Sequence, residues 1–411
     1  MAAIAYPIPD DVTSVLADLD PFLEAEVLRR HRDHHEALSD PRHRYDAEGR
    51  YTPEVQQLIR EVRTAASSAG FFNLAVPVGM GGRGMGYLAY YSAWEHIKRR
   101  CGAHNWLGTY VLSHWAFGPS RVLEQLSPQA TTDVLPDLVA GRTSMSFGLS
   151  EPDAGSDAAN LRTTATPDGD GWRLNGTKIW TTNVTFADWI LAFAVTDPAR
   201  AAARRGGISA FLVPIDAPGF RVEEIILLNG EIGGVEGRST FTDVRVEPWQ
   251  LVGPLHEGFS LAIMGVSLGR VYNAARAVGY ARWALDLALD HTATRVTFGK
   301  PIAEYQGVAF PLADAAMQVH AAHLMGINAA ALLDRGERAI KELSMAKCYA
   351  VQVCLDAVDR AIQTFGARGF RNELGLMEAY HTLRAINVAD GTNEILNRTI
   401  FQRLAAGDRD L

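Results

Sequence analysis

The spacing of apolar residues changes twice along this chain of 411 residues, from helical to extended and back again. Up to about residue 145, apolar side chains recur every three or four positions, which is typical of helices with one buried face. Short apolar runs, about ten residues apart, follow up to residue 250 and indicate strands. Helical spacing then returns. This order predicts a mainly helical α+β protein with three domains, 1–145, 146–250 and 251–411.

The two outer parts are expected to be built of helices. The N-terminal helices are predicted at residues 17–38, 53–69, 87–99 and 106–126, with a glycine-rich turn at 77–84. In the C-terminal part, residues 261–294 read as one long alanine-rich helix. Apolar residues between Ile340 and Phe365 mark the buried face of another helix, and residues 393–406 form the last.

The middle part is expected to form a small barrel or sandwich. Its strands are predicted at residues 189–195, 208–214, 220–226 and 239–246. Asn175-Gly176 stands between two further β-like runs, 172–174 and 177–180. Because these two residues accept positive φ, they predict a tight hairpin turn at this point.

Composition argues against several functional classes. The net charge is −8 and no stripe of Lys and Arg stands out, which argues against a nucleic-acid partner. No segment approaches the roughly 18 consecutive apolar residues of a membrane helix, and the N-terminus resembles neither a secretory signal nor a transit peptide. The three cysteines form no metal or redox motif, so we expect no metal and a reducing, cytoplasmic location.

Polar, glycine-containing segments carry the candidate chemistry. Residues 147–157 end an apolar strand in small residues, which let backbone N–H groups approach a ligand, and serine hydroxyls can bond phosphate or carbonyl oxygens. A second polar and aromatic run covers residues 178–183, and a third covers 363–370. In residues 389–395, Asp390 stands in a turn at a helix start with Thr392 or Asn393 as N-cap. Taken alone, each segment is also compatible with an ordinary loop.

Together these segments resemble the acyl-CoA dehydrogenase family over about residues 20–405. Residues 148–157 resemble the family's central signature, and residues 175–183 resemble its Trp-x-Thr-Asn flavin segment. Residues 295–302, continuing to Gln306, resemble its Arg-x-x-Phe-Gly segment. Residues 389–395 resemble its C-terminal segment with the catalytic base. Several motifs in the right order are far more specific than any one of them.

The resemblance implies a homotetramer with an N-terminal helical domain, a middle β-barrel-like domain and a C-terminal four-helix bundle. FAD is expected between the β-domain and the bundle, partly against a neighbouring subunit. The residues expected at the flavin ring and its chain are Phe147, Leu149, Ser150, Gly155, Ser156, Trp180, Thr182, Thr392 and Glu394. Those expected to hold the adenosine diphosphate part from the neighbouring subunit are Arg295, Phe298, Gln306, Gln363 and Gly366. Ser156, Arg270 and Gly391 are expected at the substrate.

The implied reaction is α,β-dehydrogenation of an acyl-CoA thioester to the trans-2-enoyl-CoA. A carboxylate removes the α-proton and the flavin takes the β-hydride. The family commonly has a glutamate as base, whereas this chain has Asp390, which is one methylene shorter, so the substrate or backbone must come closer. Other branches carry the base just before the position of Arg270, where this chain has Gly269. Asp390 is therefore the candidate base, with a pKa that an apolar site raises toward neutrality.

Two further departures indicate a specialised branch. Ala367 replaces the second glycine of a family Gly-Gly pair, and His381 replaces an arginine nine residues before the base. Three alternatives stay open: the same reaction on a carrier-protein thioester, a flavin monooxygenase on the same fold, and a non-catalytic subunit. Retention of residues 150–152 and Asp390 argues against the monooxygenase, and retention of the FAD residues and a carboxylate argues against the non-catalytic subunit. The expected electron acceptor is an electron-transferring flavoprotein, with dioxygen as the alternative, and the acyl group is not predicted.

Overall fold

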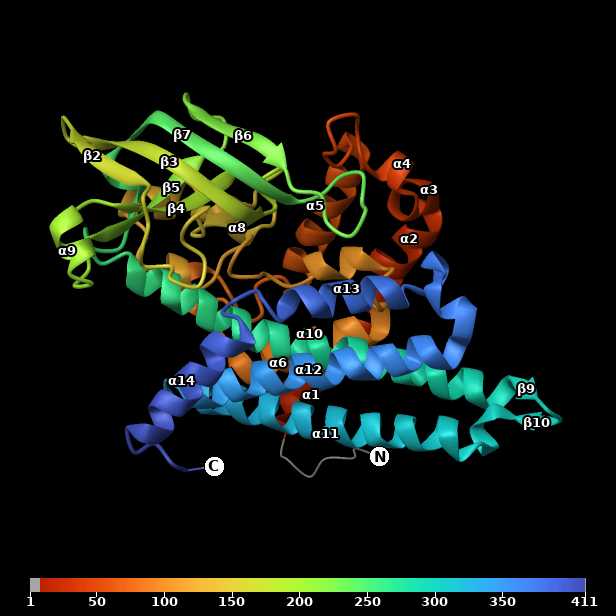
Figure 1. Cartoon of the computed structure of the whole chain (residues 1–411). Coiled ribbons are helices and arrows are strands. Elements are labelled where there is room, and N and C mark those ends of the chain that lie inside the picture. Colours follow the sequence, from red (N-terminus) through yellow and green to blue (C-terminus); the bar gives the residue numbers. More distant parts are fainter. Residues whose placement is uncertain (1–7, 411) are drawn as a thin grey trace. The chain divides into compact units, whose positions relative to one another are not determined.

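A computed structural model describes residues 8–410 of the chain (Figure 1). Its contacts divide the chain into two compact units, each made of segments far apart in the sequence. Of the described residues, the first unit comprises 8–29, 85–109 and 269–410, and the second comprises 30–84 and 110–268. Both helices and strands are present, and the chain is mainly helical with a central β-sheet, as predicted. The three-domain division with boundaries at 145 and 250 stays a prediction.

The first unit is helical. In it α11 packs against α12 and α6, and α12 packs against α13 and α14. Figure 1 shows α10, α11 and α12 as long neighbouring helices, with the β9–β10 hairpin connecting α10 to α11. Its elements are α1 Asp10–Leu23, a π-helical turn Glu24–Leu28, α6 Gly86–Cys101, α10 Phe259–Thr294 (which begins in the second unit), β9 Val296–Thr297, β10 Lys300–Pro301, α11 Gln306–Asp334, α12 Ile340–Phe365, α13 Leu376–Ile386 and α14 Asn393–Ala405.

The second unit combines short helices with the sheet. The sheet order is β6-β7-β3-β2-β4-β5-β8, and β1 pairs in parallel with β4. The elements are α2 Arg29–Asp33, α3 His35–Ser39, α4 Pro41–Arg44, α5 Pro53–Ser68, α7 Pro128–Asp133, α8 Leu135–Val139, β1 Met145–Gly148, β2 Thr164–Asp168, β3 Gly171–Thr182, β4 Trp189–Val195, α9 Pro198–Ala202, β5 Ile208–Pro214, β6 Phe220–Ile225, β7 Glu236–Val246 and β8 Leu251–Val252.

Alternation of apolar residues along these strands builds the core of the sheet. Phe220 of β6 lies opposite Phe241 of β7, and their rings are 5.0 Å apart at the centroids. Ile190 and Ala192 of β4 and Val213 of β5 are fully buried in the same cluster. The predicted strands at 189–195, 208–214, 220–226 and 239–246 and the predicted helices at 53–69, 87–99 and 261–294 are confirmed within a few residues.

The predicted hairpin turn at Asn175-Gly176 is wrong. Both residues lie inside the continuous strand β3, and the turn between β2 and β3 falls at residues 168–171. The Asn175 side chain bonds Asp243 of β7 twice, through its Nδ2 and its Oδ1, at 3.0 and 2.9 Å. At Gly176 a Cβ atom would lie 2.4 Å from Thr163 Oγ1. Asn175 lies at a β-bulge, and Gly176 lets the backbone of Thr163 come close. Glycine often occupies such positions inside strands.

The helix predicted at residues 106–126 is also wrong. Only short 3₁₀ turns form there, at Trp106–Tyr110 and Arg121–Leu123. Ser113 instead uses its backbone N–H to bond the Phe72 carbonyl at 2.8 Å, and its hydroxyl bonds the Pro119 carbonyl at 2.6 Å. These tertiary hydrogen bonds replace the helical ones, so the apolar residues are buried without helical periodicity.

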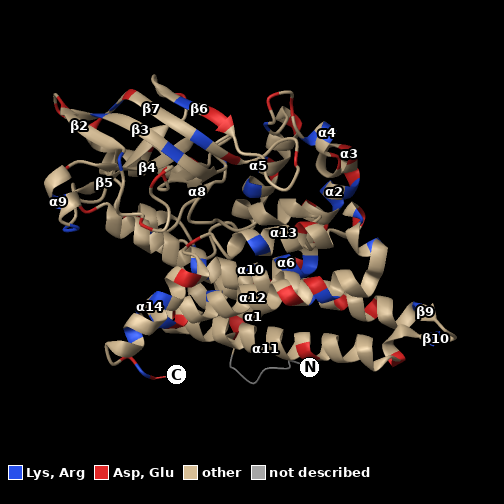
Figure 2. Cartoon of the chain, viewed as in Figure 1, with Lys and Arg blue, Asp and Glu red and all other residues tan. Residues whose placement is uncertain are grey.

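Charged residues of both signs are interspersed over the elements (Figure 2). Among residues 8–410, no helix has the length and apolar character needed to cross a membrane. Within the same residues, no group of three or more His, Cys, Asp or Glu side chains is placed to hold a metal ion.

Candidate active site

Asp390 lies in the loop between α13 and α14, at the start of α14. Its φ is +54°, a left-handed conformation that aspartate tolerates better than most residues, and Gly391 follows with φ +93°. Thr392 is the N-cap of α14 and its hydroxyl accepts a hydrogen bond from Ile395 N at 3.3 Å, as predicted. The left-handed turn therefore lies directly before the first turn of α14.

The carboxylate of Asp390 is held by a residue of α10. Asn273 Nδ2 donates to Asp390 Oδ2 at 2.7 Å, and Asn273 is fully buried. Arg270, one turn earlier on α10, approaches the Asp390 backbone oxygen with its Nε at 3.5 Å. One carboxylate oxygen is therefore oriented by the amide, and the other is available to a ligand.

Burial raises the pKa of Asp390 to about 6. Arg276, Lys347 and Arg270 oppose this shift by their positive charge, and so does the hydrogen bond from Asn273. Removing a carboxylate from water disfavours its charged form, and here this effect exceeds the attraction of the cations. Asp390 is thus mostly ionised at pH 7, with a proton affinity suited to a general base.

Lys347 of α12 anchors the loop that carries Asp390. It is buried, and its Nζ donates to the Gly391 carbonyl at 2.9 Å and to Asn393 Oδ1 at 3.3 Å. Burial lowers the pKa of Lys347 to about 8. Sequence reasoning missed both Lys347 and Asn273. A signal existed for Lys347, since it lies four residues from Leu343 and four from Val351 on the predicted buried face of α12.

Two segments expected at the flavin, residues 147–157 and 178–183, lie together in the second unit. Ile179 N donates to the Ser150 carbonyl at 2.9 Å, which joins the glycine-rich loop to β3. Beneath the loop, Lys178 Nζ lies 2.7 Å from Glu151 Oε1, and both side chains are buried. Burial raises the pKa of Glu151, but Lys178 and hydrogen bonds from the 162–163 segment outweigh this and leave it lowered. Sequence reasoning gave this ion pair no role, yet it holds the two motifs together.

The side chains on these segments differ in exposure. Phe147 and Leu149 are buried, and the Phe147 ring packs edge-on against Trp115 at 4.4 Å between centroids. Ser156 and Thr182 are exposed. Trp180 is 55% exposed with φ +57°, at a bulge of β3. A Cβ atom added at Gly155 would meet nothing within 4 Å.

A second set of expected FAD residues converges at one end of the first unit. Arg295 follows α10, and Phe298 at the tip of the β9–β10 hairpin is 99% exposed. Gln306 begins α11, while Gln363 and Gly366 lie at the end of α12. The rings of His291 and Phe365 stack at 4.3 Å, which brings the ends of α10 and α12 together.

The residues present fit FAD in both units. Large exposed aromatic rings such as Trp180 and Phe298 gain free energy when a planar aromatic group covers them. Gly155 and Gly366 leave open space beside them, and Arg295 supplies the guanidinium that pyrophosphate prefers. Arg368, also exposed and close to His291, is a further candidate that sequence reasoning did not name.

The remaining expected residues are placed as follows. Glu394 is exposed in the first turn of α14, where its backbone N–H and the Thr392 hydroxyl lower its pKa. A Cβ atom at Gly391 would lie 3.2 Å from Leu396 and 3.7 Å from the Arg270 guanidinium. Ala367 is exposed, and His381 lies half-buried on α13 beside Tyr380.

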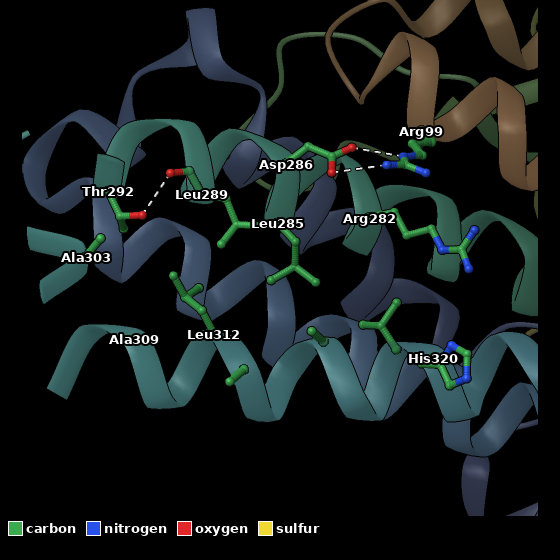
Figure 3. Close-up of a pocket in the computed structure, with 13 residues that line it drawn as sticks. Arg99, Arg282, Leu285, Asp286, Leu289, Thr292, Ala303, Ala309, Leu312 and His320 are labelled. Carbon is green, nitrogen blue, oxygen red and sulfur yellow. Dashed lines mark hydrogen bonds and ion pairs between the residues drawn. The ribbon is translucent and has the colours of Figure 1, made fainter. Parts of the chain in front are cut away.

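A separate groove of 410 Å³ runs between α10 and α11 (Figure 3). Its lining is mainly aliphatic, with Leu285, Leu289 and Leu312 in its wall. Its carboxylate, Asp286, is paired with Arg99 at 2.9 Å. None of the residues expected at FAD or substrate lines it, so the groove offers no base for the predicted reaction.

Three consecutive family models match the chain. They are the N-terminal domain of acyl-CoA dehydrogenase at residues 24–142, its middle domain at 146–243 and its C-terminal domain at 256–405. An acyl-CoA dehydrogenase of Bacillus subtilis is 34% identical over 85% of this chain and 90% of its own length. The human mitochondrial short-chain specific acyl-CoA dehydrogenase is 35% identical over 82% of this chain and 80% of its own.

Solved structures agree with these matches. Butyryl-CoA dehydrogenase from Megasphaera elsdenii superposes with a TM-score of 0.81 at 27% identity, covering 98% of this chain and 100% of its own. Fold and site define a flavin-dependent oxidoreductase that acts on CH–CH groups, with FAD as cofactor. The chain belongs to the acyl-CoA dehydrogenase family, and its substrates are acyl-CoA thioesters.

Proposed function

We propose that Asp390 is the base that removes the α-proton of the acyl-CoA, so that the product is the trans-2-enoyl-CoA. The observation that carries this proposal is a half-buried carboxylate with a pKa of about 6, held by Asn273 and beside Arg270. FAD, when bound, supplies the acceptor for the β-hydrogen and its electron pair.

The residues around Asp390 support this role. Asn273 holds Oδ2, which leaves Oδ1 to take the proton. Lys347 fixes the Gly391 carbonyl, so the loop resists movement when Asp390 changes charge. As Asp390 becomes neutral, negative charge develops on the thioester oxygen, and the nearby cations Arg270, Arg276 and Lys347 favour that charge.

The experiment is an anaerobic titration of the yellow holoenzyme with saturated acyl-CoA thioesters, followed by flavin absorbance. The flavin of the wild type should bleach. Asp390→Asn should keep its FAD, but its rate of flavin bleaching should be lower by a factor of at least about 10³. Asp314→Asn, an exposed aspartate on α11, is the matched control and should behave as wild type. Bleaching of Asp390→Asn at the wild-type rate would contradict the assignment of the base.

We further propose the homotetramer, the three domains and the FAD residues in the arrangement that the family resemblance implies. Phe298 supports a shared FAD site, since a fully exposed phenylalanine at a hairpin tip is suited to contact a second subunit. The three free cysteines support a reducing, cytoplasmic location.

An electron-transferring flavoprotein is proposed as the electron acceptor. A relative from Acetobacterium woodii, 31% identical, is named as the CarC subunit of a caffeyl-CoA reductase-Etf complex, which supports this partner. The test is reoxidation of the substrate-reduced enzyme by such a flavoprotein, compared with reoxidation by air. Faster reoxidation by air would favour dioxygen instead.

A further inference from the structure

Arg276 is a half-buried cation that attracts Asp390 by its charge but forms no contact ion pair with a carboxylate of residues 8–410. It lies on α10 one turn beyond Asn273, and its Nη1 contacts the Tyr272 hydroxyl at 3.2 Å. Its guanidinium carbon is 4.4 Å from the centre of the Tyr272 ring, and its Nε is buried without a hydrogen bond. Among residues 8–410, no carboxylate oxygen lies within 4.0 Å of this guanidinium.

Aromatic residues of α6 and α10 pack beside Arg276. Trp94 packs edge-on against Tyr272 at 4.6 Å, and Tyr90 packs against Trp94 at 6.2 Å. Behind them Lys98 is buried, with its Nζ 5.5 Å from the centres of the Trp94 and Tyr280 rings. Lys98 Nζ donates to Thr109 Oγ1 at 2.6 Å, so this second cation is also held by neutral groups.

Positive charge is in surplus in this region of the first unit. Arg276 and Lys98 repel each other, and the pKa of Lys98 is lowered to about 7 by burial and by Arg276. Arg270 and Lys347 add two further cations beside Asp390. Three carboxylates interact with these cations: Asp390, Glu378 of α13, which raises the pKa of Lys98, and Glu394 of α14, whose pKa Lys347 lowers. Partly buried cations without an anionic partner are costly, and a bound anion relieves that cost.

We infer that the acyl chain of the substrate ends in a carboxylate, so that the substrate is the CoA monothioester of a dicarboxylic acid and its free carboxylate binds Arg276. The inference rests on the proposed role of Asp390. A carboxylate matches the planar donors of a guanidinium, including the unpaired Nε. A plain alkyl chain would leave Arg276 unpaired, and a chain with an amino group would be repelled.

A second explanation of the surplus is that it serves only the negative charge developing on the thioester oxygen. The two explanations differ in what they select. Stabilisation of that oxygen accelerates every acyl-CoA equally, whereas a carboxylate site favours one acyl class over another. A comparison between acyl chains of similar length therefore separates them.

The experiment measures binding and flavin reduction for two pairs, glutaryl-CoA with pentanoyl-CoA and succinyl-CoA with butyryl-CoA, under anaerobic conditions. The dicarboxylic member should show a kcat/KM higher by about 10- to 100-fold, the range for a hydrogen bond between charged groups. Arg276→Met should abolish this advantage and Arg276→Lys should restore part of it. Arg99→Met, which removes an exposed cation paired with Asp286, is the control and should leave the ratio unchanged.

Two results would overturn the inference. One is a wild-type enzyme whose kcat/KM for the neutral member of each pair equals its kcat/KM for the dicarboxylic member. The other is an Arg276→Met variant that slows both members by the same factor. If neither member bleaches the flavin, the proposed reaction itself fails, and calorimetric binding of the same pairs still decides whether Arg276 recognises a carboxylate. FAD content of each variant confirms that it has folded.

Discussion

Replacing Asn273 with leucine, which has a similar volume but no donor, should raise the pKa of Asp390. The 2.7 Å bond from Asn273 favours the ionised carboxylate and opposes the upward shift that burial causes. A hydrogen bond to a charged group contributes roughly 1.5–3 kcal/mol. Since one pKa unit corresponds to about 1.4 kcal/mol, the loss should raise the pKa by roughly one to two units.

The consequence is a displaced pH profile. At pH 7 a base with a pKa of about 6 is roughly 90% ionised, and one with a pKa near 7.5 is roughly 25% ionised. The rate of flavin reduction in Asn273→Leu should therefore fall roughly fourfold at pH 7 and approach the wild-type rate at pH 9. In the wild type the rate should rise with pH through about 6, because Asp390, the proposed base, can accept a proton only when it is ionised.

The assay is stopped-flow flavin reduction between pH 5 and pH 9.5 with saturating substrate, with the melting temperature as a control for folding. A purely structural role for Asn273 predicts a lower plateau with an unmoved midpoint. A midpoint that stays within about 0.3 units of the wild-type value would refute the reasoning.

Three further perturbations test the remaining parts of the structure. Asp390→Asn should stabilise the fold at pH 8 by about 1–3 kcal/mol and much less at pH 4, as measured by urea unfolding. The pKa of Asp390 is raised in the folded state, so its ionisation above pH 6 lowers the stability of the wild type, whereas the amide does not ionise. Equal gains at both pH values would contradict this. Lys178→Met should destabilise the protein by roughly 3–5 kcal/mol because it leaves Glu151 buried and unpaired, and Lys178→Met with Glu151→Gln should recover most of that loss; a single variant as stable as wild type would show that the pair does not hold the loop. Arg295→Ala should weaken FAD retention and assembly, and a fully yellow tetramer after gel filtration would count against its role.

Local periodicity was sufficient for most elements of the fold. The apolar alternation of β4 and β5 and the recurring apolar face of α12 are properties of neighbouring residues, so the sequence alone predicted these elements. The predictions failed where partners distant in the sequence supply the backbone contacts. Asn175 and Gly176 belong to a strand because of Asp243 and Thr163, and Ser113 leaves the helix for Phe72 and Pro119.

In the candidate site, too, the locally determined features could be predicted from the sequence and the long-range contacts could not. Motif order and spacing located Asp390, its turn and the helix cap, because a left-handed Asp-Gly turn followed by Thr392 is a local pattern. The partner that orients the carboxylate, Asn273, is 117 residues away, and Lys347 is 44 residues from the carbonyl it holds. Burial and hydrogen bonding depend on which helices pack together. The sequence by itself therefore determined which residue we propose as the base, and only the tertiary structure decided the pKa of Asp390 and the cations that surround it.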